Sequence, residues 1–497
     1  MPQEESHTVN RQHVRRYIRF DKFITQVLIS IAFGLVLGSI SVWLSSIWVL
    51  VLLVGVLFTF ISLKRPEFAL IAILVLTSTI VYESQLPLLS FGAGSFHISD
   101  AILLVLLGLI ILRAVYEPGF DIRRTPLDFP LLAFYGSIVL STALAMLHSN
   151  LDFNLALRGL RPITYYLVFF IVTNLIREEH QLMFLIHGLF LLGTVVAGAM
   201  LAQYLVGTSL ALIPGRVETL SINYVSYEGI TRILPPGQSL ILLGFIALTM
   251  ALGMEDLRIQ SFYRLLQSGL MGIAVLLTFN RNFWTTALLA FTLFLLLVNE
   301  RVRLRITLRA IAALCVGMAG LLVILQEPKS QTANVVNASI DRLNSVLPGQ
   351  LSEDVGLQWR EREYEYALPQ IYAHPLLGLG AGAEYRPFDS DLDWEGFQGQ
   401  AYIHNGHMWI ILQAGLLGYG WLLLLSILFI VRGLTHWRRA PNYFLGGIVL
   451  GFTLTYLGLM ISNLVSPIFA QWQWTPVLGL LMGTCESIYL LNQGQNG

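Results

Sequence analysis

The sequence predicts an all-α integral membrane protein with about 12 to 14 transmembrane helices. Of its 497 residues, 55% are hydrophobic and only 12% are charged, and the mean hydropathy is +0.68. These values leave too little polar surface to cover a water-soluble protein of this length. Cys315 and Cys485 lie inside apolar runs, so we expect two buried small side chains and no disulfide.

Basic residues between the apolar runs set the predicted orientation. A polar N-terminal segment ends in a basic cluster, and every second loop after it is basic, which is typical of cytoplasmic loops. Both termini are therefore expected in the cytoplasm. The predicted spans lie near 23–41, 43–63, 67–82, 98–116, 128–147, 160–176, 181–206, 236–254, 265–280, 283–298, 310–325, 405–431, 442–463 and 473–491.

This alternation gives the domain organisation. Residues 326–403 are the one long stretch without an apolar run, and the alternation places them outside the membrane as a large extracytoplasmic loop domain. The expected parts are a cytoplasmic tail (1–22), a first part of the transmembrane bundle (23–325), the loop domain (326–403), the last part of the bundle (404–491) and a cytoplasmic tail (492–497).

Arginines occur in the short loops predicted to lie outside, where positive charge opposes the insertion bias. A single arginine there would bind lipid headgroups or a nearby carboxylate. Several together favour a shared site for an anion, because the planar guanidinium matches phosphate oxygens. The candidates are Arg158, Arg161, Arg216, Arg232 and Arg281.

The middle of the loop domain, LQWREREYEYALPQIYAHPLLGLGAG, predicts an amphipathic helix, then a His-Pro break and a glycine-rich turn. Trp359, Tyr366 and Tyr372 are spaced to form an apolar or sugar-stacking side of that helix. Further on, Asp389, Asp391 and Asp393 alternate. Alternating aspartates could bind the divalent metal of a nucleotide-sugar glycosyltransferase, but this segment is too short for the nucleotide-binding fold of those enzymes. A calcium-binding loop would need glycine at its sixth position, where Trp394 stands. We expect a solvated acidic loop that pairs with Arg360, Arg362 or Arg386, and no metal site.

The most informative stretch is HNGHMWIILQAGLLG, in which His404 and Asn405 open an apolar helix and Gly415 and Gly418 follow on the same stripe. The glycines would let a neighbouring helix approach closely. This pattern resembles the signature of the O-antigen ligase and O-antigen polymerase family of bacterial membrane glycosyltransferases. The phrase HPLLGLG also recurs in that family, and RNFWT resembles its arginine motif, although Thr285 stands where the family has leucine.

The resemblance implies a glycosyltransferase on the outer face of the inner (plasma) membrane. It would move a glycan from undecaprenyl pyrophosphate to an acceptor hydroxyl on a lipid core, a second lipid-linked glycan or a protein, with no cofactor, metal or nucleic acid. His404 would act as general base and Arg281, with the other outer arginines, would neutralise the pyrophosphate. Asn405, His407, Gly415 and Gly418 would contact substrate or pack helices. Ligase and polymerase activities are not separated by these residues.

Two other classes of membrane protein compete with this interpretation. A glycosyltransferase of the C type would need an acidic residue in the first outer loop, and the few residues around Ser41 and Val42 include none. A flippase or transporter without transferase activity is the remaining alternative, and such proteins place ionisable residues at mid-membrane. Glu486 is the clearest interior candidate, and it is expected near the inner end of the last span.

Overall fold

The computed structural model describes residues 55, 60–81, 89–91, 94–222, 225–255, 261–308, 338–341, 355–389, 392 and 399–495. The chain divides into two compact units, Met1–Arg65 and Pro66–Gly497. The predicted N-terminal tail, most of the first two predicted spans and the span near 310–325 lie outside the described residues, as does Cys315. All elements named below belong to the second unit.

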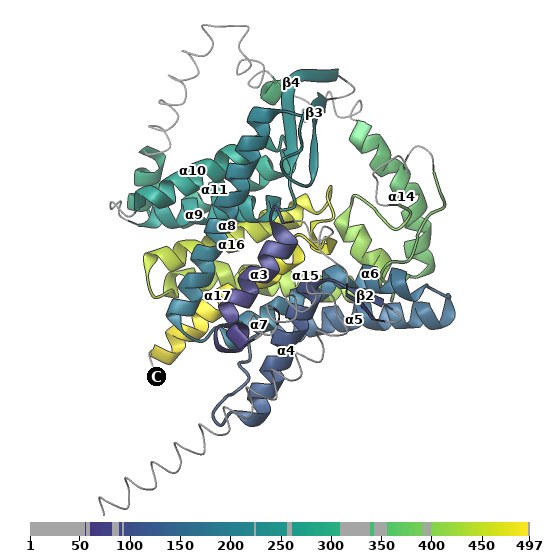
Figure 1. Ribbon diagram of the computed structural model, residues 1–497, viewed down its shortest axis with the longest axis horizontal. Helices are drawn as coiled ribbons and strands as arrows, with labels where there is room; N and C mark the ends of the chain where they lie inside the picture. Colours follow the sequence, from purple (N-terminus) through teal and green to yellow (C-terminus); the bar gives the residue numbers. More distant parts are fainter. Residues whose placement is uncertain are drawn as a thin grey trace, which may run out of the picture. The chain divides into compact units, whose positions relative to one another are not determined.

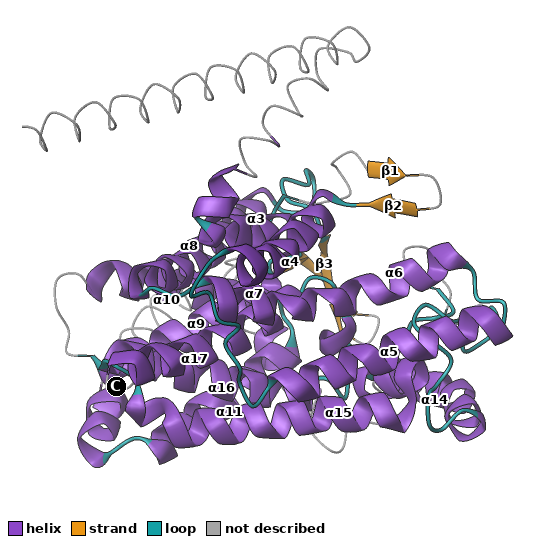
Figure 2. Cartoon of the chain, turned by 90° about the horizontal axis from the view of Figure 1, so that it is seen from below, coloured by secondary structure: helices purple, strands orange, loops and turns teal. Residues whose placement is uncertain are grey.

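The second unit is built from helices, with two small hairpins (Figures 1 and 2). Most helix bounds follow the predicted spans closely where both exist, because each bound is set by the length of an apolar run. The predicted span at 160–176 is the exception: helix begins at Phe153, in the predicted loop, and the span is divided between α6 and α7. The helices are α3 (Pro66–Ser78), α4 (Ile98–Tyr116), α5 (Asp128–His148), α6 (Phe153–Thr164), α7 (Val168–Leu175), α8 (Glu179–Val206), α9 (Gln238–Met254), α10 (Ser261–Leu277), α11 (Arg281–Leu297), α14 (Val355–Ala373), α15 (Gly406–His436), α16 (Tyr443–Ser462) and α17 (Thr475–Gln495).

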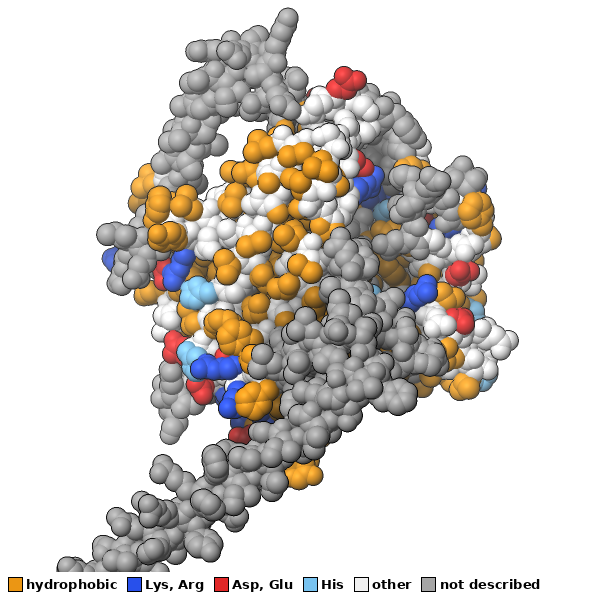
Figure 3. Space-filling model, viewed as in Figure 1, with side chains coloured by type: hydrophobic (Ala, Val, Ile, Leu, Met, Phe, Trp, Pro, Cys, Tyr) orange, Lys and Arg blue, Asp and Glu red, His pale blue; other side chains and the backbone are white. Residues whose placement is uncertain are grey.

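Six helical segments among the described residues are long and apolar enough to cross a membrane. They are Ile98–Tyr116, Asp128–His148, Phe153–Leu175, Glu179–Val206, Gly406–Arg439 and Tyr443–Ser462. Their outward faces carry large apolar side chains, such as Ile111 (66% exposed) and Val115 (68% exposed) on α4. Figure 3 shows a broad apolar face over α8 and α10, with charged side chains gathered toward its margins. The all-α membrane fold predicted from composition is confirmed.

Small residues allow the central helices to pack closely. Gly447 and Gly451 of α16 lie directly against Ala251 and Ala247 of α9, where any Cβ would overlap the neighbouring backbone. Close approach of this kind is how membrane helices gain packing energy without a hydrophobic driving force between them. Helix α16 is accordingly buried along most of its length, and it forms the centre of the bundle around which the site residues are placed.

One end of the bundle is organised by residues 463–474, which connect α16 to α17, and we call it the loop end. Here the Ser462 hydroxyl donates to the Asn282 carbonyl at the start of α11 (3.2 Å). The Gly406 amide at the start of α15 donates to the Asn463 carbonyl (2.7 Å). The Ser239 hydroxyl at the start of α9 donates to the Gln473 carbonyl (3.0 Å). The starts of α9, α11 and α15 therefore meet at the loop end.

The two hairpins were not predicted from the sequence. Strands β1 (Leu89–Phe91) and β2 (Gly94–Phe96) form one of them, and β3 (Arg216–Ile222) and β4 (Val225–Leu234) form the other. In the second hairpin Leu220 and Ile230 pack with Phe279, in the turn between α10 and α11. The hairpin thus occupies what the sequence indicated only as a loop between two spans, and it brings its arginines to the start of α11.

Candidate active site

The centre of the site is a hydrogen-bonded pair of His404 and Glu363. The Glu363 carboxylate accepts from the His404 ring Nδ1 and from the His404 backbone amide, both at 2.8 Å. The Glu363 side chain is 2% exposed, whereas that of His404 is 20% exposed. A buried carboxylate with two contacts to one residue fixes the orientation of the imidazole and places the Nδ1 proton on the side of Glu363.

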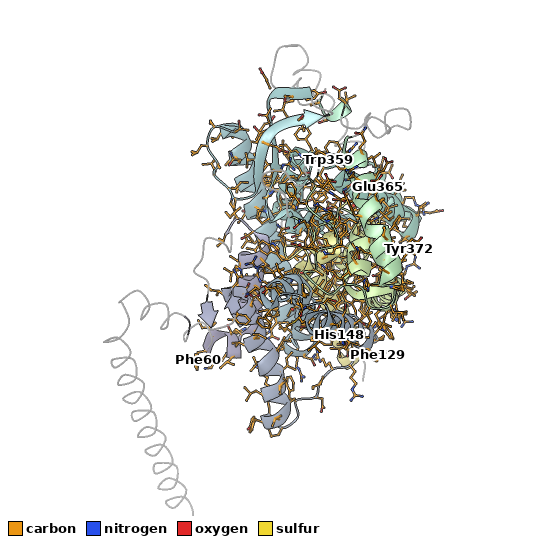
Figure 4. The ribbon with its side chains drawn as sticks, turned by 90° about the vertical axis from the view of Figure 1, so that its right-hand side faces the viewer. Phe60, Phe129, His148, Trp359, Glu365 and Tyr372 are labelled. Carbon is orange, nitrogen blue, oxygen red and sulfur yellow. The ribbon has the colours of Figure 1, made fainter. Side chains whose placement is uncertain are left out.

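Glu363 was missed by the sequence analysis, which treated its alternating charges as one polar face of an amphipathic helix. In the structure this segment is α14, which lies along the side of the molecule with Trp359, Glu365 and Tyr372 spread along it (Figure 4). The available signal was position: Glu363 follows Trp359 by four residues and therefore shares its stripe. Tyr372, expected on an apolar or sugar-stacking side, is 80% exposed, so it does not pack on an apolar side, and sugar stacking stays a prediction.

Aromatic side chains surround the pair. The Tyr402 ring packs edge to face against the His404 ring, with 5.1 Å between the ring centroids, and against the Trp409 ring, with 5.4 Å between the centroids. Burial raises the pKa of the Tyr402 hydroxyl well above its ordinary value, and the charge of Glu363 raises it further. Tyr402 therefore remains neutral and provides a rigid wall for the imidazole.

Asn405 caps the helix that follows. Its side-chain oxygen accepts from the His407 and Met408 amides at 3.0 and 3.1 Å, and its amide nitrogen donates to the Tyr364 hydroxyl of α14 at 3.1 Å. Capping satisfies amide groups that have no partner within the helix. The prediction that His404 and Asn405 open an apolar helix is confirmed, and the cap also ties α15 to α14.

His407 has a different environment from His404. Its Nε2 lies 2.9 Å from the Met460 carbonyl, and its Nδ1 lies 3.1 Å from the Tyr419 hydroxyl. One nitrogen must donate to the carbonyl and the other must accept from the hydroxyl, so both are used within the protein. This geometry favours a structural role for His407, holding α15 against α16.

Gly415 breaks α15. It has φ +63° and ψ −171° inside the helix, and residues 375–380, which we call the strap, enter the break. The carbonyls of Leu412 and Gln413 accept from the Leu379 and Gly380 amides (2.6 and 3.2 Å). On the other side, strap carbonyls accept from the Leu416 and Leu417 amides (2.7 and 3.2 Å).

The expectation of a continuous helix with a smooth packing stripe was therefore wrong at Gly415. A left-handed residue interrupts the helical hydrogen bonds, and a segment of turns and bends rather than a helix makes the close approach. Gly418 does face another helix, since α5 and α15 lie side by side in Figure 2. A Cβ at Gly418 would make an ordinary contact with Ser137 of α5 at 3.5 Å, and its closest neighbour would be Ala414 of α15 itself.

The arginines predicted to share one anion site fall into two groups. In the first, Arg216 and Arg232 both bind Glu218, at 2.6 and 3.2 Å. Arg232 also donates to the Thr278 carbonyl (3.3 Å), in the turn just before Arg281. Burial lowers the pKa of Arg232, Glu218 opposes that shift, and the nearby charges of Arg216 and Arg281 add to it. Two guanidinium groups thus bind one carboxylate, and the charge of Arg281 acts on Arg232 from nearby.

Arg158 and Arg161 form the second group, on α6. Arg161 is paired with Asp100 of α4 (Nε to Oδ1, 3.0 Å) and lies over the Trp472 ring. Both arginines line a cavity of about 540 Å³ between α4 and α6, whose lining does not include the first group. In Figure 1, α6 and the β3–β4 hairpin are well separated.

Both groups reach the loop end. Arg161 of the second group does so through Trp472, and the first group does so through the end of α16, which also bonds to the start of α15. Asn282, next to Arg281, bonds to Ser462, and the following residue, Asn463, bonds to Gly406, two residues from His404. The starts of α11 and α15 therefore bond to two consecutive residues, Ser462 and Asn463, at the loop end.

The aspartates of the loop domain are arranged differently from the expectation. Asp389 is only 7% exposed and accepts from Arg362 Nε and the Tyr366 hydroxyl, both at 3.0 Å. Arg362 is thus one of the partners that the sequence proposed, but the prediction of a solvated Asp389 was wrong, because this contact buries it. Asp391 and Asp393 lie outside the described residues. Among the residues described, no three His, Cys, Asp or Glu side chains form a metal-binding group.

Comparison with known protein families adds a decisive observation. Residues 267–423 match the family model described as O-antigen ligase. These residues form an O-antigen ligase family domain. The domain includes Arg281, Glu363, His404 and the break at Gly415, and it ends just beyond Gly418. No curated protein matches the chain.

The O-antigen ligase domain supports a membrane glycosyltransferase of the ligase or polymerase type. Such proteins handle a lipid-linked glycan and an acceptor. The His404–Glu363 pair and the start of α11 both lie inside the matched segment, whereas Arg158, Arg161, Arg216 and Arg232 lie before it. The family match therefore covers the catalytic candidate and one of the anion-binding candidates.

Proposed function

We propose that the protein transfers a glycan from undecaprenyl pyrophosphate to an acceptor hydroxyl, with the reaction centred on His404. The observation that carries this proposal is the buried Glu363 carboxylate held against Nδ1 of a partly exposed histidine. A carboxylate on one imidazole nitrogen leaves the lone pair on the other, which is the arrangement of a general base.

In this mechanism Nε2 of His404 takes the proton of the acceptor hydroxyl. The acceptor oxygen forms a bond with the anomeric carbon of the donor glycan, and the bond from that carbon to the pyrophosphate oxygen breaks. Undecaprenyl pyrophosphate leaves with the bonding electrons as an anion. Glu363 does not take up the proton; it orients the ring and stabilises the imidazolium that forms.

The leaving group is proposed to bind at the start of α11. Arg281 is the first residue of this helix, after the Asn280 cap, so its side chain and the positive end of the helix dipole act in the same place. Arg232, held by Glu218 and Thr278, adds a second fixed positive charge. Such preorganised charge stabilises the negative charge that grows on the pyrophosphate.

The loop end is proposed to face the outer side of the membrane, with 326–403 as the extracytoplasmic loop domain and both termini in the cytoplasm. The support is the distribution of arginines. At the ends of α4, α15 and α17 opposite the loop end lie Arg113 in the last turn of α4, Arg432 near the end of α15, and the connecting segments that carry Arg123, Arg124, Arg177, Arg438 and Arg439. Positive residues collect on the cytoplasmic side of membrane proteins.

The test is transfer by purified protein in nanodiscs with a synthetic polyprenyl-pyrophosphate glycan. His404→Ala is expected to lower kcat by roughly 10²- to 10⁴-fold, the usual contribution of a general base. His148→Ala, at an exposed histidine at the end of α5, is the matched control and is expected to retain activity. Full activity of His404→Ala would refute the base assignment, and glycan-lipid flipping without transfer by the wild type would favour a transporter.

Glu363 is proposed as a positioning residue, which Glu363→Gln tests. The amide keeps the size of the side chain but loses the charge that orients and stabilises the imidazolium. We expect kcat to fall roughly tenfold to a hundredfold, with donor KM and the melting temperature close to wild type. A fall in melting temperature with unchanged kcat would show that Glu363 only holds α14 against α15.

A further inference from the structure

The cavity between α4 and α6 carries one charge that none of the described residues neutralises. Arg161 is bonded to the Asp100 carboxylate through Nε, at 3.0 and 3.1 Å. Arg158, one turn earlier on the same face of α6, is exposed and makes no ion pair or hydrogen bond with the described part of the chain. The two arginines and one aspartate leave the lining with one net positive charge, carried by Arg158.

The opposite wall of the cavity is apolar and continues onto the outer face of α4. Leu104 lines the cavity and is 56% exposed. Ile111, Leu112 and Val115 continue along the same side of the helix, at 66%, 54% and 68% exposure. These positions share one helical stripe, so an apolar track leads from the cavity along a membrane-spanning helix. A molecule that satisfies both walls needs an anionic head and at least one hydrocarbon chain.

The cavity is large enough, and polar enough, to hold a sugar in addition to a phosphate group. Its volume of about 540 Å³ lies within the range of roughly 300–1,000 Å³ that is usual for small-molecule sites. Asn154, beside Arg158 on the cavity face of α6, offers both a donor and an acceptor, and the indole of Trp472 forms another part of the wall. Amide and aromatic side chains next to a cation provide contacts for a sugar that carries a phosphate.

We propose that this cavity binds the acceptor, an anionic glycolipid, with its phosphate at Arg158, its sugar near Asn154 and Trp472, and a hydrocarbon chain along α4. The proposal rests on the proposed transferase function for the role of the ligand, but not for its binding. It separates the two arginine groups by substrate: Arg281 and Arg232 serve the donor, and Arg158 serves the acceptor. Arg161, neutralised by Asp100, holds the two walls together.

Binding is tested with a photoreactive acylated disaccharide phosphate, whose diazirine sits on the acyl chain, added to the full-length protein in phosphatidylcholine nanodiscs. Crosslinks are expected in the α4 peptide that contains Leu104 to Val115. Arg158→Gln should reduce crosslinking roughly tenfold, as expected for loss of a charge-assisted contact, and Arg158→Lys should reduce it less. Arg124→Gln is the matched control, because Arg124 is another exposed arginine without a hydrogen bond in the described part of the chain.

Competition distinguishes the glycolipid from ordinary membrane lipid. The unlabelled disaccharide phosphate should compete at least tenfold better than phosphatidic acid, which shares its charge and chains but lacks sugar. Equal competition would overturn the acceptor assignment and identify a general anionic-lipid site. Absence of α4 crosslinks, or equal crosslinking of wild type and Arg158→Gln, would overturn the site itself.

Kinetics connect the cavity to the reaction. Arg158→Gln is expected to raise KM for the acceptor roughly tenfold and to leave KM for the polyprenyl-pyrophosphate donor unchanged. A rise in donor KM alone would overturn the proposal and return Arg158 to the pyrophosphate site. If the wild type bound the disaccharide phosphate on α4 but transferred nothing, the proposed function would fail and the acceptor role with it, while the glycolipid site would stand.

Discussion

The break in α15 depends on Gly415, and replacing this glycine with alanine should disrupt the site from a distance. At φ +63° an alanine is strained, and its Cβ would overlap the backbone of Leu376 and Leu377 in the strap. A non-glycine residue in such a conformation costs about 1–3 kcal/mol. Four backbone hydrogen bonds join the strap to α15, and each contributes about 1 kcal/mol net. We therefore expect Gly415→Ala to destabilise the protein by roughly 2 to 6 kcal/mol.

The strap also connects α14 to the break, so the same substitution should affect transfer. Glu363 lies on α14, and the strap begins two residues after that helix ends at Ala373. If the strap withdraws, Glu363 loses its fixed position against His404. Gly415→Ala should therefore lower kcat in addition to stability, although Gly415 is eleven residues from His404 and makes no described contact with it.

The assay is thermal unfolding in detergent, with transfer measured in parallel, and Gly420→Ala provides the control. Gly420 lies on the same helix without a positive φ, and a Cβ there would meet nothing within 4 Å. Alanine at that position should be neutral or stabilising by about 0.5–1 kcal/mol. Equal melting temperatures for the two variants would refute the account of the strap.

Three further substitutions test other contacts. Asn405→Ala should cost about 0.5–2 kcal/mol through loss of the cap, and Asn405→Asp should recover most of it; urea-induced unfolding compares the two. Ser141→Ala removes a hydroxyl that contacts the Leu377 and Gln413 carbonyls, so we expect a loss of about 1–3 kcal/mol and faster proteolysis at the strap, and unchanged proteolysis would contradict this. Arg432→Met removes the bidentate partner of the buried Glu486 carboxylate (2.7 Å to each oxygen) and should lower the free energy of unfolding by about 3–5 kcal/mol. Adding Glu486→Leu should restore most of the melting temperature. If it does not, the pair has a role beyond mutual neutralisation.

The sequence alone determined the class of fold and most helix bounds. The predicted span at 98–116 is α4, and the predicted span at 181–206 is α8 to within two residues. These predictions succeed because a helix that crosses a bilayer must be a continuous apolar run of fixed length. The opening of α15 at His404 and Asn405 was also predictable, since capping is a local interaction between neighbouring residues.

The partners of the site residues were decided only by the tertiary structure. Glu363 and His404 are 41 residues apart. The stripe that Glu363 shares with Trp359 indicates which carboxylate of α14 faces inward, but nothing in the sequence of α14 identifies His404 as its partner. The grouping of the arginines depends likewise on their carboxylate partners. Glu218 lies across the β3–β4 hairpin from Arg232, and Asp100 lies on α4, a different helix from Arg161. A continuous apolar pattern also gave no sign that α15 breaks at Gly415, because the strap that fills the break supplies the missing hydrogen bonds from another part of the chain. The length and hydropathy of an apolar run are local properties that can be read from consecutive residues. The pairing of distant polar groups depends instead on how the helices pack.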